Sequence, residues 1–257
     1  MLASRRRTLR SGLVLLMRGR DAVRRYGIGG TVRQALEHVR GARARRTAAR
    51  ADRDFDRRHG VDTAGVVRLR DLDIESANVV HGIRYESTDP TLFRELLHAL
   101  PIEYGEFTFV DLGAGKGRTL LLAAERPFRA VIGVEFAAEL AEVARQNVET
   151  YRGERRCADV RVLCGDAVDF APPDTPLVLY LFHPFEGPVL RAVIDGVERS
   201  LLERPRPIFA VLTGETTAAG LLQQIGFVRL PVGPAWLGDR RGIFAPANPA
   251  AGSHERT

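Results

Sequence analysis

Cysteine is almost absent from this chain of 257 residues, which contains only Cys157 and Cys164. Two cysteines are too few for a disulfide framework, and their spacing does not match that of zinc ligands. We therefore predict no metal site and a reducing compartment, most simply the cytoplasm.

Long apolar runs are also missing. The run Gly12–Met17 is far too short to cross a bilayer. It follows arginines, as the apolar part of a signal peptide does, but no small-residue cleavage site comes after it. We expect neither a membrane span nor a cleaved leader.

Basic charge is confined to one end of the chain. Residues 1–60 contain 17 arginines and 5 acidic residues, a net charge of +12, whereas the rest has 21 basic and 27 acidic residues, a net charge of −6. Contact with nucleic acid or an anionic membrane surface is one interpretation of this arm. A solvated or disordered extension is the other, and the interleaved aromatics of a single-strand binder are nearly absent.

The segment Phe107–Phe136 carries the strongest pattern. Phe107–Leu112 is apolar and predicts a central parallel strand, and Arg118–Glu125 predicts a helix whose N-terminal amides face a ligand. Val131–Val134 predicts a second buried strand, closed by Glu135, whose carboxylate can accept hydrogen bonds from both ribose hydroxyls of a nucleotide cofactor. The turn between the first strand and the helix contains Asp111, Leu112, Gly113, Ala114, Gly115, Lys116 and Gly117.

The glycine spacing separates two cofactor classes. The dinucleotide fingerprint is GxGxxG, whereas Gly113, Gly115 and Gly117 give GxGxG, with Asp111 two positions earlier. S-adenosylmethionine has no pyrophosphate to cradle, so Asp111 can hold its ammonium group while the glycine backbone passes its methionine part. The spacing of a P-loop is absent, and we expect Lys116 to be exposed at the turn or near the cofactor carboxylate.

A third acidic residue follows a third strand. Val160–Leu163 is a short β-like run, and Asp166 and Ala167 come soon after it. A carboxylate here can accept a hydrogen bond from an adenine amino group, and the next backbone amide can donate to the ring. A loop or N-cap role is the alternative for Asp166, but its place in a series with Asp111 and Glu135 favours cofactor binding.

From Phe107 to about Phe185 the chain resembles class I S-adenosylmethionine-dependent methyltransferases. Within that superfamily it is similar to a bacterial group of largely uncharacterised proteins, with a distant likeness to Dot1-type lysine methyltransferases in its VDLGAGKG and GVE segments. The resemblance implies the cofactor S-adenosyl-L-methionine, with Glu135 at the ribose, Phe136 beside adenine and Asp166 on the adenine side. The cofactor-binding residues expected are Asp111, Gly113, Ala114, Gly115, Gly117, Glu135, Phe136, Asp166, Ala167 and Phe182.

Methyl transfer is expected at the carboxyl end of the fourth strand, within Thr175–Phe182. The sequence that follows, HPF, only partly resembles the [DNS]-PP-[YF] motif of amino-group methyltransferases, which puts adenine- or glutamine-type acceptors in doubt. His183 is a candidate general base, because imidazole titrates near neutrality. Orienting the substrate or capping the loop are alternative roles for it. Tyr85 is the second candidate catalytic residue, with simple packing as its alternative role.

We divide the chain into a basic helical or flexible arm (1–54), a lid-like segment with a helix (55–100), a methyltransferase core (101–246) and a disordered tail (247–257). Alternating strands and helices predict an α/β, Rossmann-like, doubly wound sheet of seven mostly parallel strands. Its C-terminal antiparallel hairpin is expected around a loop carrying Trp236. The other expected elements are helices from Asp89-Pro90 to Leu100, Ala137–Tyr151, Glu186–Leu202 and Glu215–Ile225, and strands Pro207–Thr213, Phe227–Pro231 and Gly242–Ala245.

Two other functions are compatible with parts of the sequence. An NAD-dependent oxidoreductase is disfavoured by the missing GxGxxG and by Asp166. A non-catalytic cofactor-sensing or nucleic-acid-binding module would work through the basic arm. A protein or nucleic-acid acceptor fits that arm, whereas a small molecule fits the lid-like segment equally well.

Overall fold

The structure is a computed structural model that describes residues 33, 36–37, 43, 46–74, 76–214, 217–232 and 242–247. The chain forms two compact units, Met1–Ala51 and Asp52–Thr257. Most of the expected basic arm, the loop carrying Trp236 and the tail beyond residue 247 lie outside the described residues. The four-part division made from the sequence stays a prediction.

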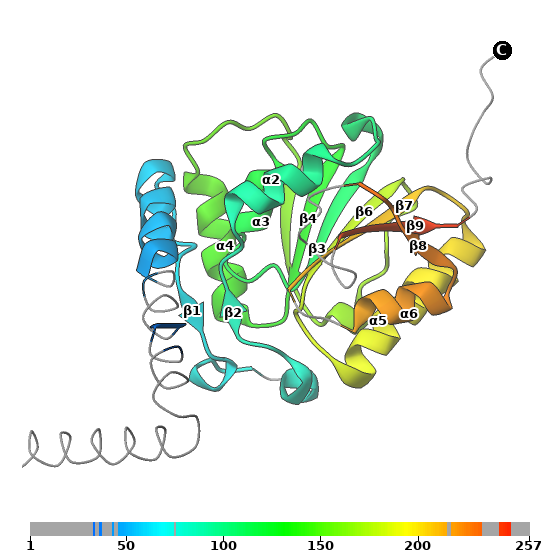
Figure 1. Cartoon of the computed structure of the whole chain (residues 1–257), viewed down its shortest axis with the longest axis horizontal. Coiled ribbons are helices and arrows are strands. Elements are labelled where there is room, and N and C mark those ends of the chain that lie inside the picture. The colour runs from blue at the N-terminus through cyan, green and yellow to red at the C-terminus, as the bar shows by residue number, and fades with distance from the viewer. Residues whose placement is uncertain are drawn as a thin grey trace, which may run out of the picture. The chain divides into compact units, whose positions relative to one another are not determined.

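The second unit is built on a seven-stranded sheet with the order β5-β4-β3-β6-β7-β9-β8 (Figure 1). Strands β3 to β7 are parallel, and β9 runs antiparallel to both β7 and β8. This confirms the predicted Rossmann-like sheet with its antiparallel C-terminal hairpin. The strands are β3 (Thr108–Leu112), β4 (Ala130–Glu135), β5 (Val160–Cys164), β6 (Leu177–Phe182), β7 (Ile208–Thr213), β8 (Phe227–Arg229) and β9 (Gly242–Pro246).

Helices cover both faces of the sheet, because the central strands are apolar on both sides. In β3, Phe109 joins the apolar cluster under α2 and α3, whereas its neighbour Val110 joins the cluster under α5 and α6. In Figure 1, α2, α3 and α4 lie on one side of the sheet and α5 and α6 on the other. The helices are α2 (Pro90–His98), α3 (Arg118–Ala123), α4 (Ala138–Thr150), α5 (Gly187–Glu203) and α6 (Ala218–Gln224).

The ends of α2 and α3 show what the local sequence determines. Asp89 caps α2 as predicted, since its Oδ1 accepts hydrogen bonds from the backbone N–H groups of Thr91 and Leu92, at 2.8 and 3.0 Å. Both helices end two residues before the predicted positions, α2 at His98 and α3 at Ala123. Short 3₁₀-type turns take over there, which is common in the last turn of a helix.

Residues 52–88 wrap around the carboxyl end of the sheet, and we call them the strap. Residues 52–59 are helical, and β1 (Val66–Val67) pairs with β2 (Tyr85–Glu86) in an antiparallel ribbon. Short 3₁₀ helices η1 (Leu69–Asp71) and η2 (Ala77–His81) lie between the two strands. In the described part of the chain, no helix is long and apolar enough to span a membrane.

Candidate active site

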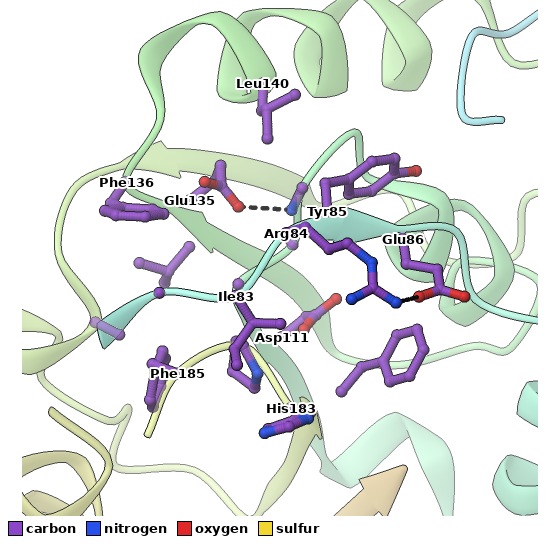
Figure 2. Close-up of a pocket in the computed structure, with 18 of the residues that line it drawn as sticks. Ile83, Arg84, Tyr85, Glu86, Asp111, Glu135, Phe136, Leu140, His183 and Phe185 are labelled. Atoms are coloured by element: carbon purple, nitrogen blue, oxygen red, sulfur yellow. Dashed lines mark hydrogen bonds and ion pairs between the residues drawn. The ribbon is translucent and has the colours of Figure 1, made fainter. Parts of the chain in front are cut away.

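A cavity of about 440 Å³ lies where the carboxyl ends of β3, β4 and β6 meet the strap (Figure 2). Strands β3 and β6 are neighbours in the sheet. The strand that pairs with β3 on its other side is β4, and the one that pairs with β6 on its other side is β7, so the strand order reverses between β3 and β6. Such a reversal of strand order opens a crevice at the carboxyl ends of a parallel sheet. Of the residues expected at the cofactor, those lining the cavity are Asp111, Gly113, Ala114, Gly115, Glu135, Phe136, Asp166, Ala167 and Phe182.

The glycine turn has the backbone conformation that its composition predicts. Gly113, Gly115 and Gly117 have φ angles of 96°, 53° and 82°, a region that other residues seldom adopt. A Cβ on Gly115 would lie 2.2 Å from the ring of Tyr85, so this backbone lies directly against the strap. Gly117 does not line the cavity: it precedes α3, and a Cβ there would meet Ala144 of α4.

Glu135 joins the end of β4 to the glycine turn. Its Oε2 accepts a hydrogen bond from the Gly115 N–H at 2.7 Å, drawn in Figure 2, and its Oε1 accepts one from Ala137 at 3.0 Å. Burial raises the pKa of the Glu135 carboxyl, and the backbone donors act against that rise. Each oxygen retains a lone pair for a further donor.

Asp111 has an oxygen without a partner. Its Oδ2 accepts a hydrogen bond from the Thr119 hydroxyl, whereas its Oδ1 is buried and meets no donor among the described residues. Burial, with a smaller contribution from the charge of Glu135, raises the pKa of Asp111 to about 7. An unpaired buried carboxylate oxygen is costly, which points to a cationic or N–H donor from a ligand at this position.

Asp166 is already hydrogen-bonded to the strap. Its Oδ2 accepts from the Ser76 hydroxyl at 2.7 Å and from the Asn78 side-chain amide at 2.8 Å, and its Oδ1 accepts from the Val168 N–H at 3.1 Å. Burial acts to raise the pKa of Asp166, but these donors outweigh it and lower the pKa. Asp166 therefore caps the short helix η4 (Ala167–Asp169) while it also lines the cavity.

His183 lies at the carboxyl end of β6, as predicted, and lines the cavity with Phe182 and Phe185. Its φ of 46° makes it the sole non-glycine residue with a positive φ among those the structure describes. The His183 Nε2 lies 2.7 Å from Oε1 of Glu186, just before α5. This partner was not predicted from the sequence.

Tyr85 and its neighbours in the strap form the opposite wall (Figure 2). The Tyr85 hydroxyl donates to the backbone carbonyl of Thr63 at 2.5 Å, and burial raises the pKa of the phenol far above its usual range. Glu86 pairs with Arg84 at 3.0 Å, and both side chains are about half exposed. The phenol hydroxyl therefore joins two parts of the strap, while its ring lies against Gly115 of the glycine turn.

Arg118 is a buried charge that sequence reasoning missed. Its side chain is 2% exposed and forms ion pairs with Asp52 and, at 3.5 Å, with Asp56. Its Nε donates to the Thr63 hydroxyl at 2.7 Å, and its guanidinium lies 4.8 Å from the Phe55 ring centroid. This residue, the first of α3, fastens the strap beside the glycine turn.

Lys116 and Asn147 make a second attachment of the strap. Lys116 forms an ion pair with Asp62 at 2.9 Å. Asn147 of α4 donates from Nδ2 to the carbonyls of Asp62 and Lys116, each at 2.8 Å. Lys116 is thus neither exposed nor turned to the cavity, contrary to expectation, because the strap supplies a carboxylate for it.

Residues 109–203 match the family model described as a methyltransferase domain. No curated protein matches the chain significantly. Within the described residues, no group of three or more histidine, cysteine, aspartate or glutamate side chains is placed to hold a metal ion.

Solved structures similar to the chain include several methyltransferases. The 23S rRNA methyltransferase ErmE is 20% identical, with 49% of this chain and 46% of that one aligned at a TM-score of 0.36. The mitomycin 7-O-methyltransferase MmcR is 17% identical, with 61% of this chain and 52% of that one aligned at a TM-score of 0.43. Precorrin-6y C5,15-methyltransferase from Geobacter metallireducens GS-15 is 17% identical, with 62% of this chain and 78% of that one aligned at a TM-score of 0.43. The chain spans about half the length of ErmE and MmcR.

The family match concerns one part of the chain. Residues 109–203 match a methyltransferase domain, and they lie within the Rossmann-like sheet of seven strands. The matched residues run from β3 to the end of α5 and so include the glycine turn, Glu135, Asp166 and His183.

Proposed function

We propose that the cavity binds S-adenosylmethionine in one defined orientation and that the methyl group passes to a small molecule. The observation that carries this proposal is the buried Asp111 Oδ1, which lacks a donor among the described residues and lies beside the glycine turn. An ammonium group would complete it with a charge-assisted hydrogen bond. This oxygen supports a pose with the methionine end of the cofactor at Asp111.

In this orientation, Glu135 and Asp166 contact the nucleoside part of the cofactor. Glu135 has lone pairs for the ribose hydroxyls, and its position is fixed by the N–H groups of Gly115 and Ala137. Phe136 supplies an apolar surface for the adenine ring, and Ala167 lines the same cavity. The carboxylate of Asp166 is oriented by Ser76 and Asn78, so its remaining acceptor capacity faces the adenine amino group.

When bound, S-adenosylmethionine supplies a methyl group on a positively charged sulfur that leaves readily. The protein then has to hold the acceptor in line with the methyl group and to exclude water. Phe182 and His183, at the carboxyl end of β6, form the wall where the acceptor would lie. The ring of Tyr85 lies against Gly115 of the glycine turn and forms part of the same wall.

The size of the cavity supports a small acceptor. Ligand pockets run from about 300 to 1,000 Å³, and about 440 Å³ is at the lower end of that range. The strap also covers the cavity with residues 82–86, which leaves little room for a folded protein or a duplex.

Calorimetry with S-adenosylmethionine, S-adenosylhomocysteine and NADH tests the cofactor assignment. We expect both sulfur compounds to bind and NADH not to bind. Glu135→Ala should weaken binding by about 10- to 100-fold through lost charged hydrogen bonds. Gly115→Arg should abolish binding, because any side chain there meets the Tyr85 ring.

Glu142→Ala is the matched control for Glu135→Ala, since Glu142 is an exposed carboxylate on α4 that pairs with Arg145. It should bind the cofactor normally. Normal binding by Glu135→Ala as well would show that the nucleoside lies elsewhere.

Three finer proposals rest on the sequence alone. We propose a cytoplasmic location from the scarcity of cysteine, and a distant relation to Dot1-type enzymes from the VDLGAGKG segment. The 17 arginines of residues 1–60 support contact with nucleic acid or an anionic surface. A salt dependence near zero for binding to an RNA or DNA oligonucleotide would remove the nucleic-acid proposal, because phosphate contacts release counterions.

A further inference from the structure

We propose that His183 and Glu186 act as a pair that removes the proton from a phenolic hydroxyl acceptor, so that the enzyme is an O-methyltransferase for small phenols. This inference rests on the proposed function, since it requires S-adenosylmethionine in the cavity. Glu186 is the positioning residue, and His183 is the residue that contacts the acceptor.

The backbone at His183 is held in an unusual conformation by its neighbours. A φ of 46° is rare for a residue with a side chain, although histidine tolerates it better than most. Pro184, which follows, packs so closely on the glycine turn that a Cβ on Gly113 would lie 2.4 Å from its own Cβ. A Cβ on Gly214, after β7, would lie 3.0 Å from the His183 Cβ. Such over-determined strain is typical of functional sites.

The contact with Glu186 determines which nitrogen of His183 carries the proton. Glu186 Oε1 lies 2.7 Å from Nε2, and an ionised carboxylate can only accept a hydrogen bond. The Nε2 atom therefore carries hydrogen, and the lone pair of the neutral ring is on Nδ1. No hydrogen bond to Nδ1 is formed by the described residues, so this nitrogen is available to an acceptor.

The walls of the acceptor end favour a planar, apolar acceptor. Phe182 and Phe185 flank His183 in sequence, and all three line the cavity together with Ile83 of the strap. An aromatic ring would gain offset or edge-to-face contacts with these phenylalanines. The charged pair of Arg84 and Glu86 lies in the same lining, about half exposed, and already satisfies itself.

The chemistry explains why a base would be useful here. A carboxylate or a neutral amine can attack the methyl group without losing a proton first. A phenol, with a pKa of about 10, arrives protonated at neutral pH and needs a base as it reacts. An acceptor of this class is therefore the one that makes use of a free Nδ1 lone pair.

The proposed step is balanced. The phenol oxygen forms a bond to the methyl carbon, and the carbon–sulfur bond breaks with its electron pair going to sulfur. The hydroxyl proton passes to Nδ1 of His183, and the imidazolium is stabilised by the Glu186 carboxylate. The products are the methyl ether and S-adenosylhomocysteine, and the proton later leaves to solvent.

Two phenols that differ in ionisation test this step. At about pH 8.5, 4-methylphenol is still protonated, because phenols of this kind have a pKa near 10, whereas 4-nitrophenol is already ionised. We expect methyl transfer from labelled S-adenosylmethionine to both. His183→Asn keeps a side chain that tolerates positive φ, and should slow transfer to 4-methylphenol by about 100-fold or more while changing transfer to 4-nitrophenol little.

His98→Asn is the control, because His98 is exposed on α2 and does not line the cavity. Equal loss on both phenols in His183→Asn would overturn the role of His183 as base. No transfer to either phenol by a protein that binds S-adenosylmethionine in calorimetry would overturn the phenolic acceptor. Failure to bind S-adenosylmethionine would instead overturn the proposed function.

The role of Glu186 has a readout that does not depend on turnover. Nitrogen-15 NMR of the histidine rings should show His183 as the tautomer with hydrogen on Nε2 in the wild type. Glu186→Gln should lose that preference, because an amide can donate to Nε2 as well as accept from it. It should also lower kcat for 4-methylphenol with KM nearly unchanged. An unchanged tautomer with an unchanged kcat would overturn the positioning role.

Discussion

Asp111 shows how a single buried side chain can be unfavourable for the empty protein and useful for its ligand. Its carboxyl is 2% exposed, and one oxygen has a single hydroxyl donor while the other has none among the described residues. Burial disfavours the charged form, which raises the pKa of Asp111 to about 7. The ammonium group of a bound cofactor would reverse that balance. We therefore expect pH to act in opposite directions on cofactor binding and on the stability of the empty protein.

Binding of S-adenosylmethionine should weaken as the pH falls from about 7 to about 5.5, because Asp111 takes up a proton in the empty cavity. The pKa of Glu135 is also raised by burial, and this group faces the same cavity. Asp111→Asn separates the contributions of the two carboxyls, since the variant should bind the cofactor weakly at every pH and its affinity should change less with pH. Calorimetry across this pH range checks the prediction. If the affinity of the variant changes with pH as steeply as that of the wild type, the effect belongs to Glu135.

Stability of the empty protein should change in the other direction. The folded-state pKa of Asp111, about 7, lies above the ordinary value of 3.8. The folded state therefore keeps a proton that the unfolded chain releases, and stability is lost as the pH rises between those two values. Asp111→Asn should have a higher Tm than the wild type near pH 8 and an equal one near pH 4. A lower Tm for the variant at pH 8 would contradict this.

At the scale of elements, the strap is held to the core by buried charge. Arg118 is paired with Asp52 and Asp56, whose side chains are 21% and 13% exposed. Removing the cation would leave two carboxylates without it in a poorly solvated site, which is far more costly than loss of a surface pair. The network joins the helical residues 52–59 to the first turn of α3.

Arg118→Met should lower the free energy of unfolding by about 3–5 kcal/mol, because it leaves Asp52 and Asp56 without their buried counterion. Urea denaturation measures this. The control is Arg145→Met, whose pair with Glu142 is exposed and should contribute at most about 1 kcal/mol. If both variants lose the same small amount, the strap is not held by Arg118.

At the scale of the whole molecule, the compact unit that contains the site begins at Asp52. Removal of residues 1–51 should leave Tm and S-adenosylmethionine binding unchanged, because all lining residues and Asp52 are retained. Removal of residues 1–60 should destabilise the protein, since Asp52, Phe55 and Asp56 are then lost. Thermal unfolding and calorimetry of both forms compare these outcomes. Impaired cofactor binding after the shorter deletion would mean that the basic arm takes part in the site.

Most of the residues expected at the cofactor line one cavity, because their sequence signals are local. Asp111, the glycine turn and Glu135 each follow directly from where a strand ends. The prediction of a mostly parallel sheet needed only the alternation of apolar strands with helices. The same locality explains why helix ends were misplaced by two residues at His98 and Ala123.

The strap and the acceptor end were less predictable, for physical reasons. Arg118 looks like any first residue of a helix, and its partner Asp52 is 66 positions away in the sequence. No propensity rule pairs residues over such a separation. His183 pairs with Glu186 from a backbone with positive φ, a conformation that glycine and asparagine signal in a sequence more strongly than histidine does. Tyr85 was identified as a site residue without its hydrogen bond to Thr63.

The strand order β5-β4-β3-β6-β7 has a consequence for how this protein can change over evolution. The segment from β3 to η4 supplies most of the residues proposed for the cofactor, whereas Ile83 of the strap, before that segment, and Phe182 and His183, after it, line the acceptor end. The walls of the cavity are thus encoded by separate stretches of the gene. Mutations in the strap or from the end of β6 onward can alter the acceptor end while Asp111 and Glu135 stay unchanged, so new acceptors are accessible without loss of the residues proposed to bind the methyl donor.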